Sequence, residues 1–136
     1  MPNLIHASES STLALHAALL LARAEGRLTT AAIARQLGAS AAHLAKVMAR
    51  LEKAGLVRSV RGPGGGYALA RPARTITLLE IYTAVEGPLT AGRCLFRVPT
   101  CNGGGCPLGA FFRNVSRTVA DRLARTRLAD VRIHLR

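Results

Sequence analysis

The sequence is poor in aromatic residues and has no long apolar run. It contains no tryptophan, two tyrosines and three phenylalanines, although 49% of its residues are hydrophobic, so we expect an aliphatic core. The longest apolar stretch, residues 13–22, is interrupted by His16 and is shorter than the roughly 20 residues that a membrane-spanning helix needs. The N-terminus lacks the basic, apolar and small-residue regions of a signal peptide. These absences predict a cytoplasmic protein with no membrane contact.

Acidic residues are also scarce. The chain has 7 Asp and Glu against 19 Lys and Arg, a formal net charge of +12. Such a charge favours a polyanionic partner, most often nucleic acid, although an arginine-rich composition can also reflect a GC-rich genome. Residues 27–74 carry nine Lys and Arg and one acid, Glu52, a net charge of +8. Composition alone would not concentrate charge in this way, so we predict that this segment binds nucleic acid.

Cysteine is confined to one short stretch, at Cys94, Cys101 and Cys106. An odd number of cysteines in a cytoplasmic protein argues against a disulfide framework, and the clustering indicates shared chemistry. No catalytic signature surrounds any of the three, and none of the four histidines is near them in sequence. A cysteine nucleophile needs a base beside it, so we do not expect an enzyme.

Apolar periodicity and capping residues predict a mainly α-helical fold with a small β-hairpin. Helices are expected from about residue 12 to 23 and over residues 31–37, 41–54, 78–86 and 108–125, with strands over 56–61 and 67–70. This order is that of a winged helix-turn-helix followed by a long helix. The predicted organisation is a DNA-binding domain (1–88), a cysteine sensor loop (89–107), and a dimerisation helix with a C-terminal segment (108–136).

The second helix of the predicted helix-turn-helix has one apolar side. Its other side combines small residues with polar ones, which would let the helix approach the floor of a DNA groove. The alternative is an ordinary pair of helices with a solvated polar face, which the short connection and the following hairpin make less favourable. The predicted DNA contacts of this helix are Ser40, His43, Lys46 and Arg50.

The predicted hairpin carries two arginines and a glycine-rich tip, Gly62–Gly66. Arg61 lies nearest the tip and is our candidate for insertion into a minor groove, where negative potential attracts arginine, while Arg58 is a second contact. The N–H groups of Gly64 and Gly65 are candidates for bonds to phosphate. A hairpin without a ligand and a nucleotide-binding loop are alternatives, but no Lys-Ser/Thr follows as in a phosphate-binding loop.

The string VRGPGGGYALARPARTITLLEIYTAVEG, residues 60–87, resembles the wing and following helix of the IscR/NsrR family of bacterial winged-helix regulators. The resemblance extends over almost the whole chain. It implies a homodimer, paired through the long C-terminal helix, that binds a pseudo-palindromic double-stranded operator. The helix over 41–54 would lie in the major groove and the hairpin in the minor groove. Our leading hypothesis is a repressor; an architectural protein that binds DNA without sequence preference is the alternative.

In the resembled family, three cysteines of such a loop bind an iron–sulfur cluster that senses iron–sulfur status, nitric oxide or oxidant. Cys94, Cys101 and Cys106 are the counterparts here, for a 2Fe-2S or a 4Fe-4S cluster. Their spacings are uneven, and Gly109 occupies the position where some relatives have a ligating histidine. We expect His16 of the partner subunit as the fourth ligand, with Glu9 and His6 as weaker candidates; the alternative role for His16 is packing.

Two other readings of the cysteines stay open. Two of the three thiols could form a disulfide under oxidant, which would make a redox switch without any cofactor. Alternatively, three thiols and a histidine suit zinc, or the thiols are only structural.

Overall fold

The computed structural model describes residues 7–24, 26–89 and 105–134. It confirms a mainly α-helical chain with a two-stranded antiparallel hairpin. The elements are, in order, α1 (Glu9–Ala24), α2 (Thr30–Leu37), α3 (Ala41–Lys53), β1 (Val57–Val60), β2 (Gly66–Leu69), the 3-10 turn η1 (Ala73–Thr75), α4 (Leu78–Glu86), α5 (Pro107–Arg125) and the 3-10 turn η2 (Leu128–Asp130).

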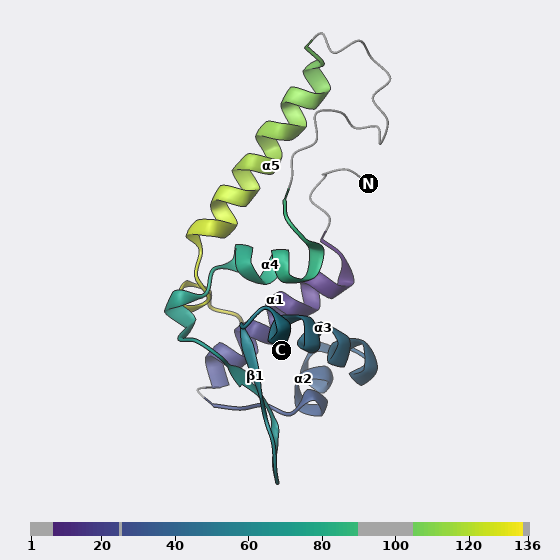
Figure 1. Cartoon of the computed structure of the whole chain (residues 1–136), viewed down its shortest axis with the longest axis vertical. Helices are drawn as coiled ribbons and strands as arrows, with labels where there is room; N and C mark the ends of the chain where they lie inside the picture. The colour runs from purple at the N-terminus through teal and green to yellow at the C-terminus, as the bar shows by residue number, and fades with distance from the viewer. Residues whose placement is uncertain (1–6, 25, 90–104, 135–136) are drawn as a thin grey trace.

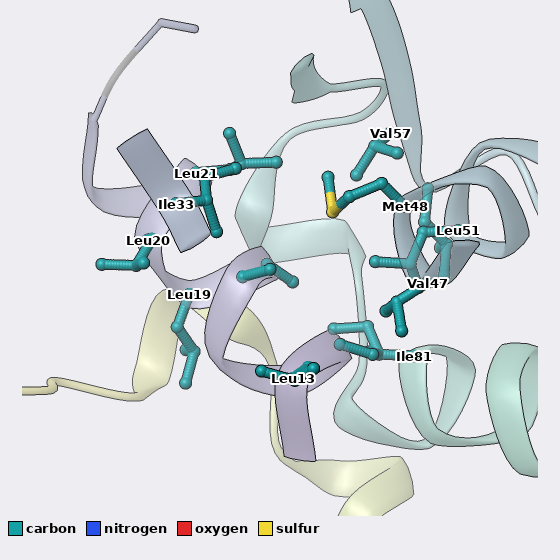
Figure 2. Close-up of a cluster of buried hydrophobic side chains, with 14 of the residues drawn as sticks. Leu13, Leu19, Leu20, Leu21, Ile33, Val47, Met48, Leu51, Val57 and Ile81 are labelled. Atoms are coloured by element: carbon teal, nitrogen blue, oxygen red, sulfur yellow. The ribbon is translucent and has the colours of Figure 1, made fainter. Parts of the chain in front are cut away.

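The core is aliphatic, as the scarcity of aromatic residues predicts. Helix α1 lies at its centre and is buried on several sides, because its leucines and alanines surround most of the helix. Figure 2 shows side chains from α1 facing those of α2, α3, β1 and α4. The labelled members are Leu13, Leu19, Leu20, Leu21, Ile33, Val47, Met48, Leu51, Val57 and Ile81.

Local capping chemistry sets the bounds of α2 and α3. The Thr29 hydroxyl accepts the N–H of Ala32 at 3.1 Å, and the Ser40 hydroxyl accepts the N–H of His43 at 3.0 Å. Between the helices, Gly38 has φ +62°, a left-handed conformation that ends α2 with little strain. The short connection of the helix-turn-helix is therefore encoded by residues that each have a defined backbone role.

The hairpin, residues 57–69, is called the wing below. Val57 pairs with Leu69 and Val60 with Gly66 in an antiparallel register. The wing is also fixed along its outer edge: Leu28 N–H donates to the Tyr67 carbonyl at 3.0 Å, and Tyr67 N–H donates to the Leu28 carbonyl at 2.8 Å. The segment between α1 and α2 thus acts as a third, single-residue strand, which the sequence pattern did not predict.

Helix α5 has 19 residues and begins at Pro107, one residue before the start expected from the sequence, since proline is favoured in the first turn of a helix. Figure 1 shows α5 extending from the helical body at one end, while the wing projects from the opposite end. After α5 the chain returns to the body, where Leu128 N–H donates to the Ile76 carbonyl at 2.9 Å and the Leu128 side chain is buried.

The start of α4 is held by a capping box. The Thr77 hydroxyl accepts the Glu80 N–H, and the Glu80 carboxylate accepts the Thr77 N–H at 2.9 Å and is paired with Arg71 at 2.9 Å. Burial by itself raises the pKa of Glu80, but hydrogen bonds from Thr77 and Arg71 and the charge of Arg71 outweigh it, so the pKa lies below its ordinary value. This contact joins the end of the wing to α4.

We expect Glu80→Ala to lower the free energy of unfolding at pH 7 by about 1 kcal/mol, because it removes one half of the capping box. A carboxylate with a depressed folded pKa contributes stability above its unfolded pKa and loses it as pH falls through the folded pKa. Urea unfolding should therefore show a difference between variant and parent at pH 7 that shrinks below about pH 4. A difference that stays constant with pH would contradict this role.

Candidate nucleic-acid interface and cysteine segment

The wing and one face of α3 form a cationic surface. Arg58 and Arg61 are exposed on the wing, and Lys46 and Arg50 are exposed on α3. The base of the wing packs into the core through Val57, while its tip projects beyond the helices (Figure 1). The structure thus presents exposed cations both on α3 and on a projecting wing.

Two of the predicted contacts on α3 are bonded to other helices. His43 Nε2 is hydrogen-bonded to the Ser10 hydroxyl of α1 at 3.0 Å, and its Nδ1 lies 3.8 Å from the Glu9 carboxylate. Arg50 donates to the Val85 carbonyl at the end of α4, at 3.4 Å. The sequence did not anticipate these contacts, because the partners are more than 30 residues away along the chain.

The other two polar candidates, Ser40 and Lys46, differ in whether their side chains are already hydrogen-bonded within the protein. The Ser40 hydroxyl is engaged as the helix cap described above. Lys46 is exposed and has no hydrogen-bond partner among the described residues, and Arg50, Glu52 and Lys53 are exposed further along the helix, together with four alanines. The exposed alanines are Ala41, Ala42, Ala45 and Ala49.

The tip of the wing is a tight turn. Gly65 N–H donates to the Gly62 carbonyl at 2.8 Å, with Pro63 and Gly64 between them and Gly64 at φ +70°. Proline followed by a glycine with positive φ is the pattern of a type II turn. The Gly65 amide is thus already engaged within the turn, and a Cβ there would lie 2.6 Å from the Val60 carbonyl oxygen.

The acidic residues of this region are used internally. Glu52, the one acid in residues 27–74, accepts the Ser59 hydroxyl at 2.6 Å and the Ser59 N–H at 3.3 Å. This bond fixes the first wing strand against α3. The positive charge of residues 27–74 has little local compensation, because Glu52 is the one acid against nine Lys and Arg.

Of the candidate cluster ligands, the structure describes Cys106, His16 and Glu9, whereas Cys94, Cys101 and His6 lie outside the described residues. Glu9 is exposed and lies 3.8 Å from the His43 ring. Cys106 is exposed and caps α5, with its sulfur accepting the Gly109 N–H at 3.5 Å. His16 is half-buried on α1, and its Nδ1 must donate to the Thr12 carbonyl at 2.8 Å, since a carbonyl only accepts. This bond leaves Nε2 as the atom with a free lone pair.

Within residues 7–24, 26–89 and 105–134, no three His, Cys, Asp or Glu side chains are grouped closely enough to hold a metal. Figure 1 shows the first turn of α5 at the far end of the molecule from the helical body that contains α1. The chain therefore does not bring His16 to Cys106 by itself.

In the same described ranges, no helix is both long and apolar enough to span a membrane.

The cysteine segment, residues 89–107, follows α4 in the chain. The end of α4 is bonded to α3 and to the start of α1. The Ser8 hydroxyl, at the start of α1, donates to the Glu86 carboxylate. Arg50 of α3 bonds the Val85 carbonyl, as described above. The residues just before the cysteine segment thus contact α3 directly.

The comparisons with known proteins agree with this architecture. The family profile Rrf2, described as an iron-dependent transcriptional regulator, matches residues 7–132. NMA1593 of Neisseria meningitidis, named as an HTH-type transcriptional regulator, is 34% identical over 106 residues, which cover 78% of this chain and 72% of that protein. The transcriptional regulator IscR of Xenorhabdus nematophila is 36% identical over 107 residues, covering 79% of this chain but only 65% of IscR.

Two solved structures extend the comparison to the fold. CymR, the global cysteine regulator of B. subtilis, has a TM-score of 0.77 at 27% identity, covering 93% of this chain and 95% of CymR. T. potens IscR has a TM-score of 0.72 at 30% identity, covering 93% of this chain and 85% of IscR. The relatives are regulators and not enzymes, which rules out a cysteine-nucleophile enzyme. The chain belongs to the Rrf2 family and is a DNA-binding transcriptional regulator.

Proposed function

We propose that the chain is a homodimeric repressor that binds a pseudo-palindromic operator, with α3 in the major groove and the wing in the adjacent minor groove. The observation that carries this proposal is the projecting, arginine-bearing wing beside an α3 whose outer face is cationic and small. Small side chains allow a helix to sit deep in a groove, and an extended hairpin can reach the next one. The proposed contacts are Lys46, Arg50, Arg58, Arg61 and Gly64. Ser40, His43 and the Gly65 N–H already have hydrogen-bond partners within the chain and would contact DNA only by exchanging them.

The outer surface of α5 supports a dimer. Leu108 and Phe111 are each 60% exposed, and Phe111 stacks edge-on against Phe112 at 5.4 Å between ring centroids. Large apolar side chains exposed together at helical spacing mark an interaction surface. Pairing two chains through α5 would place two wings and two α3 helices on one operator.

An Arg61→Ala variant tests the DNA-binding arrangement. We expect its affinity for an operator selected from random duplexes to fall about tenfold or more, in line with about 1–3 kcal/mol for a specific base contact. Arg117→Ala, which removes the same charge from an exposed position on α5, is the control and should bind normally. Gel shifts at several salt concentrations measure both. Unchanged binding by Arg61→Ala would remove the wing from the interface, and equal binding to selected and random DNA would favour the architectural alternative.

For sensing, we propose that Cys94, Cys101 and Cys106 bind an iron–sulfur cluster, with His16 of the partner subunit as the fourth ligand. The residues described fit this role: Cys106 has an exposed thiol, and His16 has a lone pair on Nε2. When bound, a cluster would supply reactivity toward oxidant and nitric oxide. The end of α4, which leads into the cysteine segment, is bonded to α3 and to the residue before α1. A change in the cysteine segment that moves the end of α4 would therefore also move α3.

A thiol switch without a cluster is the second candidate. Among the similar structures is Staphylococcus aureus CymR in an oxidized form, at 25% identity and a TM-score of 0.77. A visible absorption spectrum of protein purified without oxygen, with its iron and sulfide content, separates the two. A brown protein bleached by nitric oxide supports the cluster, whereas a colourless one that loses free thiols under oxidant supports the switch.

A cluster held by the three cysteines makes Cys101 essential for sensing, and so does any disulfide that includes it. We expect Cys101→Ala to retain operator binding and the thermal unfolding midpoint of the parent, but to lose the change in operator affinity caused by nitric oxide or oxidant. Gel shifts with and without treatment measure the response. A variant that responds like the parent would exclude the cluster and every disulfide that includes Cys101.

A further inference from the structure

We propose that Arg27 is part of the DNA-reading surface, and that this regulator selects its operator mainly through the minor groove, where Arg27 acts with Arg61. The inference rests on the proposed function and goes beyond it by assigning a further contact and a class of operator. Residue 27 precedes α2 and belongs to neither of the two motifs from which the DNA contacts were predicted.

Arg27 is fixed beside the wing by backbone pairing. Its neighbour Leu28 exchanges two hydrogen bonds with Tyr67, so the register of residue 27 along the wing is set. The guanidinium then reaches the tip, where Nη2 donates to the Pro63 carbonyl at 3.4 Å. The same nitrogen lies 3.2 Å from the position that a Cβ on Gly64 would occupy. A second cation thus joins Arg61 at the tip of the wing.

The positive charge at the tip is available to a ligand. Arg27, Arg58 and Arg61 are all exposed, and the ion pairs found among the described residues involve other side chains. Each arginine presents a planar fork of donors on a weakly hydrated charge, which suits insertion into a narrow groove. The negative potential of a minor groove is strongest where A·T-rich sequence makes it narrow.

By contrast, α3 has few groups with which to read base edges. His43 is bonded to Ser10 and Ser40 caps its own helix, so the exposed cations of α3 are Lys46, Lys53 and Arg50, the last with one 3.4 Å bond to the Val85 carbonyl. Four exposed alanines, at 41, 42, 45 and 49, make up much of the surface beside them. Alanine can contact a thymine methyl but supplies none of the bidentate hydrogen bonds that discriminate most strongly between bases. The operator class that fits these two surfaces has A·T-rich, narrow minor grooves beneath the wings.

The test uses the full-length protein and an operator selected from random duplexes, located by footprinting. At the wing positions each A·T pair is replaced either by G·C or by inosine·C, which matches A·T in the minor groove and G·C in the major groove. We expect G·C to weaken binding about tenfold or more and inosine·C to weaken it less than threefold. If inosine·C weakens binding as much as G·C, the wing positions are read in the major groove and the proposal is wrong.

Arg27→Ala tests the residue itself. We expect affinity for the selected operator to fall about tenfold and the preference for A·T over G·C beneath the wing to shrink. Arg27→Lys keeps the charge and should recover part of the affinity but not the preference, while Arg117→Ala should change neither. Thermal unfolding shows whether the wing remains intact in each variant. A folded Arg27→Ala with parental affinity and preference would overturn the assignment, whereas a parent that selects no sequence would instead overturn the proposed function.

Discussion

Gly66→Ala is expected to disrupt the wing and to abolish operator binding. A Cβ on Gly66 would lie 2.2 Å from the Leu28 carbonyl oxygen, 2.6 Å from its carbon and 2.8 Å from the Thr29 Cα. All three are backbone atoms, so no side chain can move aside, and φ of +154° at Gly66 is itself unfavourable for alanine. The contact that would be lost is the pairing of Leu28 with Tyr67, which holds the wing to the body.

We expect this change to cost about 2–4 kcal/mol of unfolding free energy, in the range of substitutions that force strain on a special backbone position. Operator affinity should fall by about a hundredfold or more, because both Arg27 and Arg61 would be displaced. Urea unfolding and gel shifts measure the two effects. Gly26→Ala is the matched control, since the nearest atom to its Cβ is 3.7 Å away. Normal operator binding by Gly66→Ala would show that the wing is not held in this way.

Phe111→Arg is expected to produce a folded monomer with very weak operator binding. The side chain is 60% exposed in the single chain, so a charge there should leave the fold intact. In a dimer paired through α5, the same charge would be buried without a partner. When one subunit of a dimer binds its half-site, the other subunit is held at a high effective concentration near the second half-site. Losing the dimer should therefore reduce operator affinity by about a hundredfold or more.

Ala110→Arg is the matched control for this experiment. Residue 110 is exposed and, by helical spacing, lies away from the apolar side of α5 that carries Leu108 and Phe111. Light scattering after size exclusion gives the mass, and gel shifts give the affinity. We expect the control to remain a dimer and to bind. A Phe111→Arg protein that remains dimeric would place the subunit interface elsewhere.

The features that could be predicted from the sequence are those encoded locally. Thr29, Ser40 and Thr77 cap helices through their own hydroxyls, and Gly38 and Pro107 mark a helix end and a helix start. Each of these signals depends on a few neighbouring residues, so it does not require knowledge of the tertiary structure. The order of helices and strands, and with it the winged-helix fold, follows from such signals and from apolar periodicity.

The features that could not be predicted depend on contacts between distant segments. Nothing near His43 indicates that α1 would bond its ring, and nothing near Arg50 indicates a contact with α4. The pairing of Leu28 with Tyr67, which brings Arg27 to the wing, spans two motifs that sequence analysis treats separately. The candidate residues on the polar face of α3 therefore differ in whether their side chains already have hydrogen-bond partners. The sequence also gives no sign that Arg27 lies beside the tip of the wing.

In the proposed complex, one chain places α3 and the wing in neighbouring grooves of the same duplex. Interference by dimethyl sulfate tests this directly, since the reagent methylates guanine N7 in the major groove and adenine N3 in the minor groove. We expect each operator half-site to show adenine N3 interference beneath the wing, next to a block of guanine N7 interference beneath α3. Interference confined to one groove, or the same weak pattern on random DNA, would contradict the account.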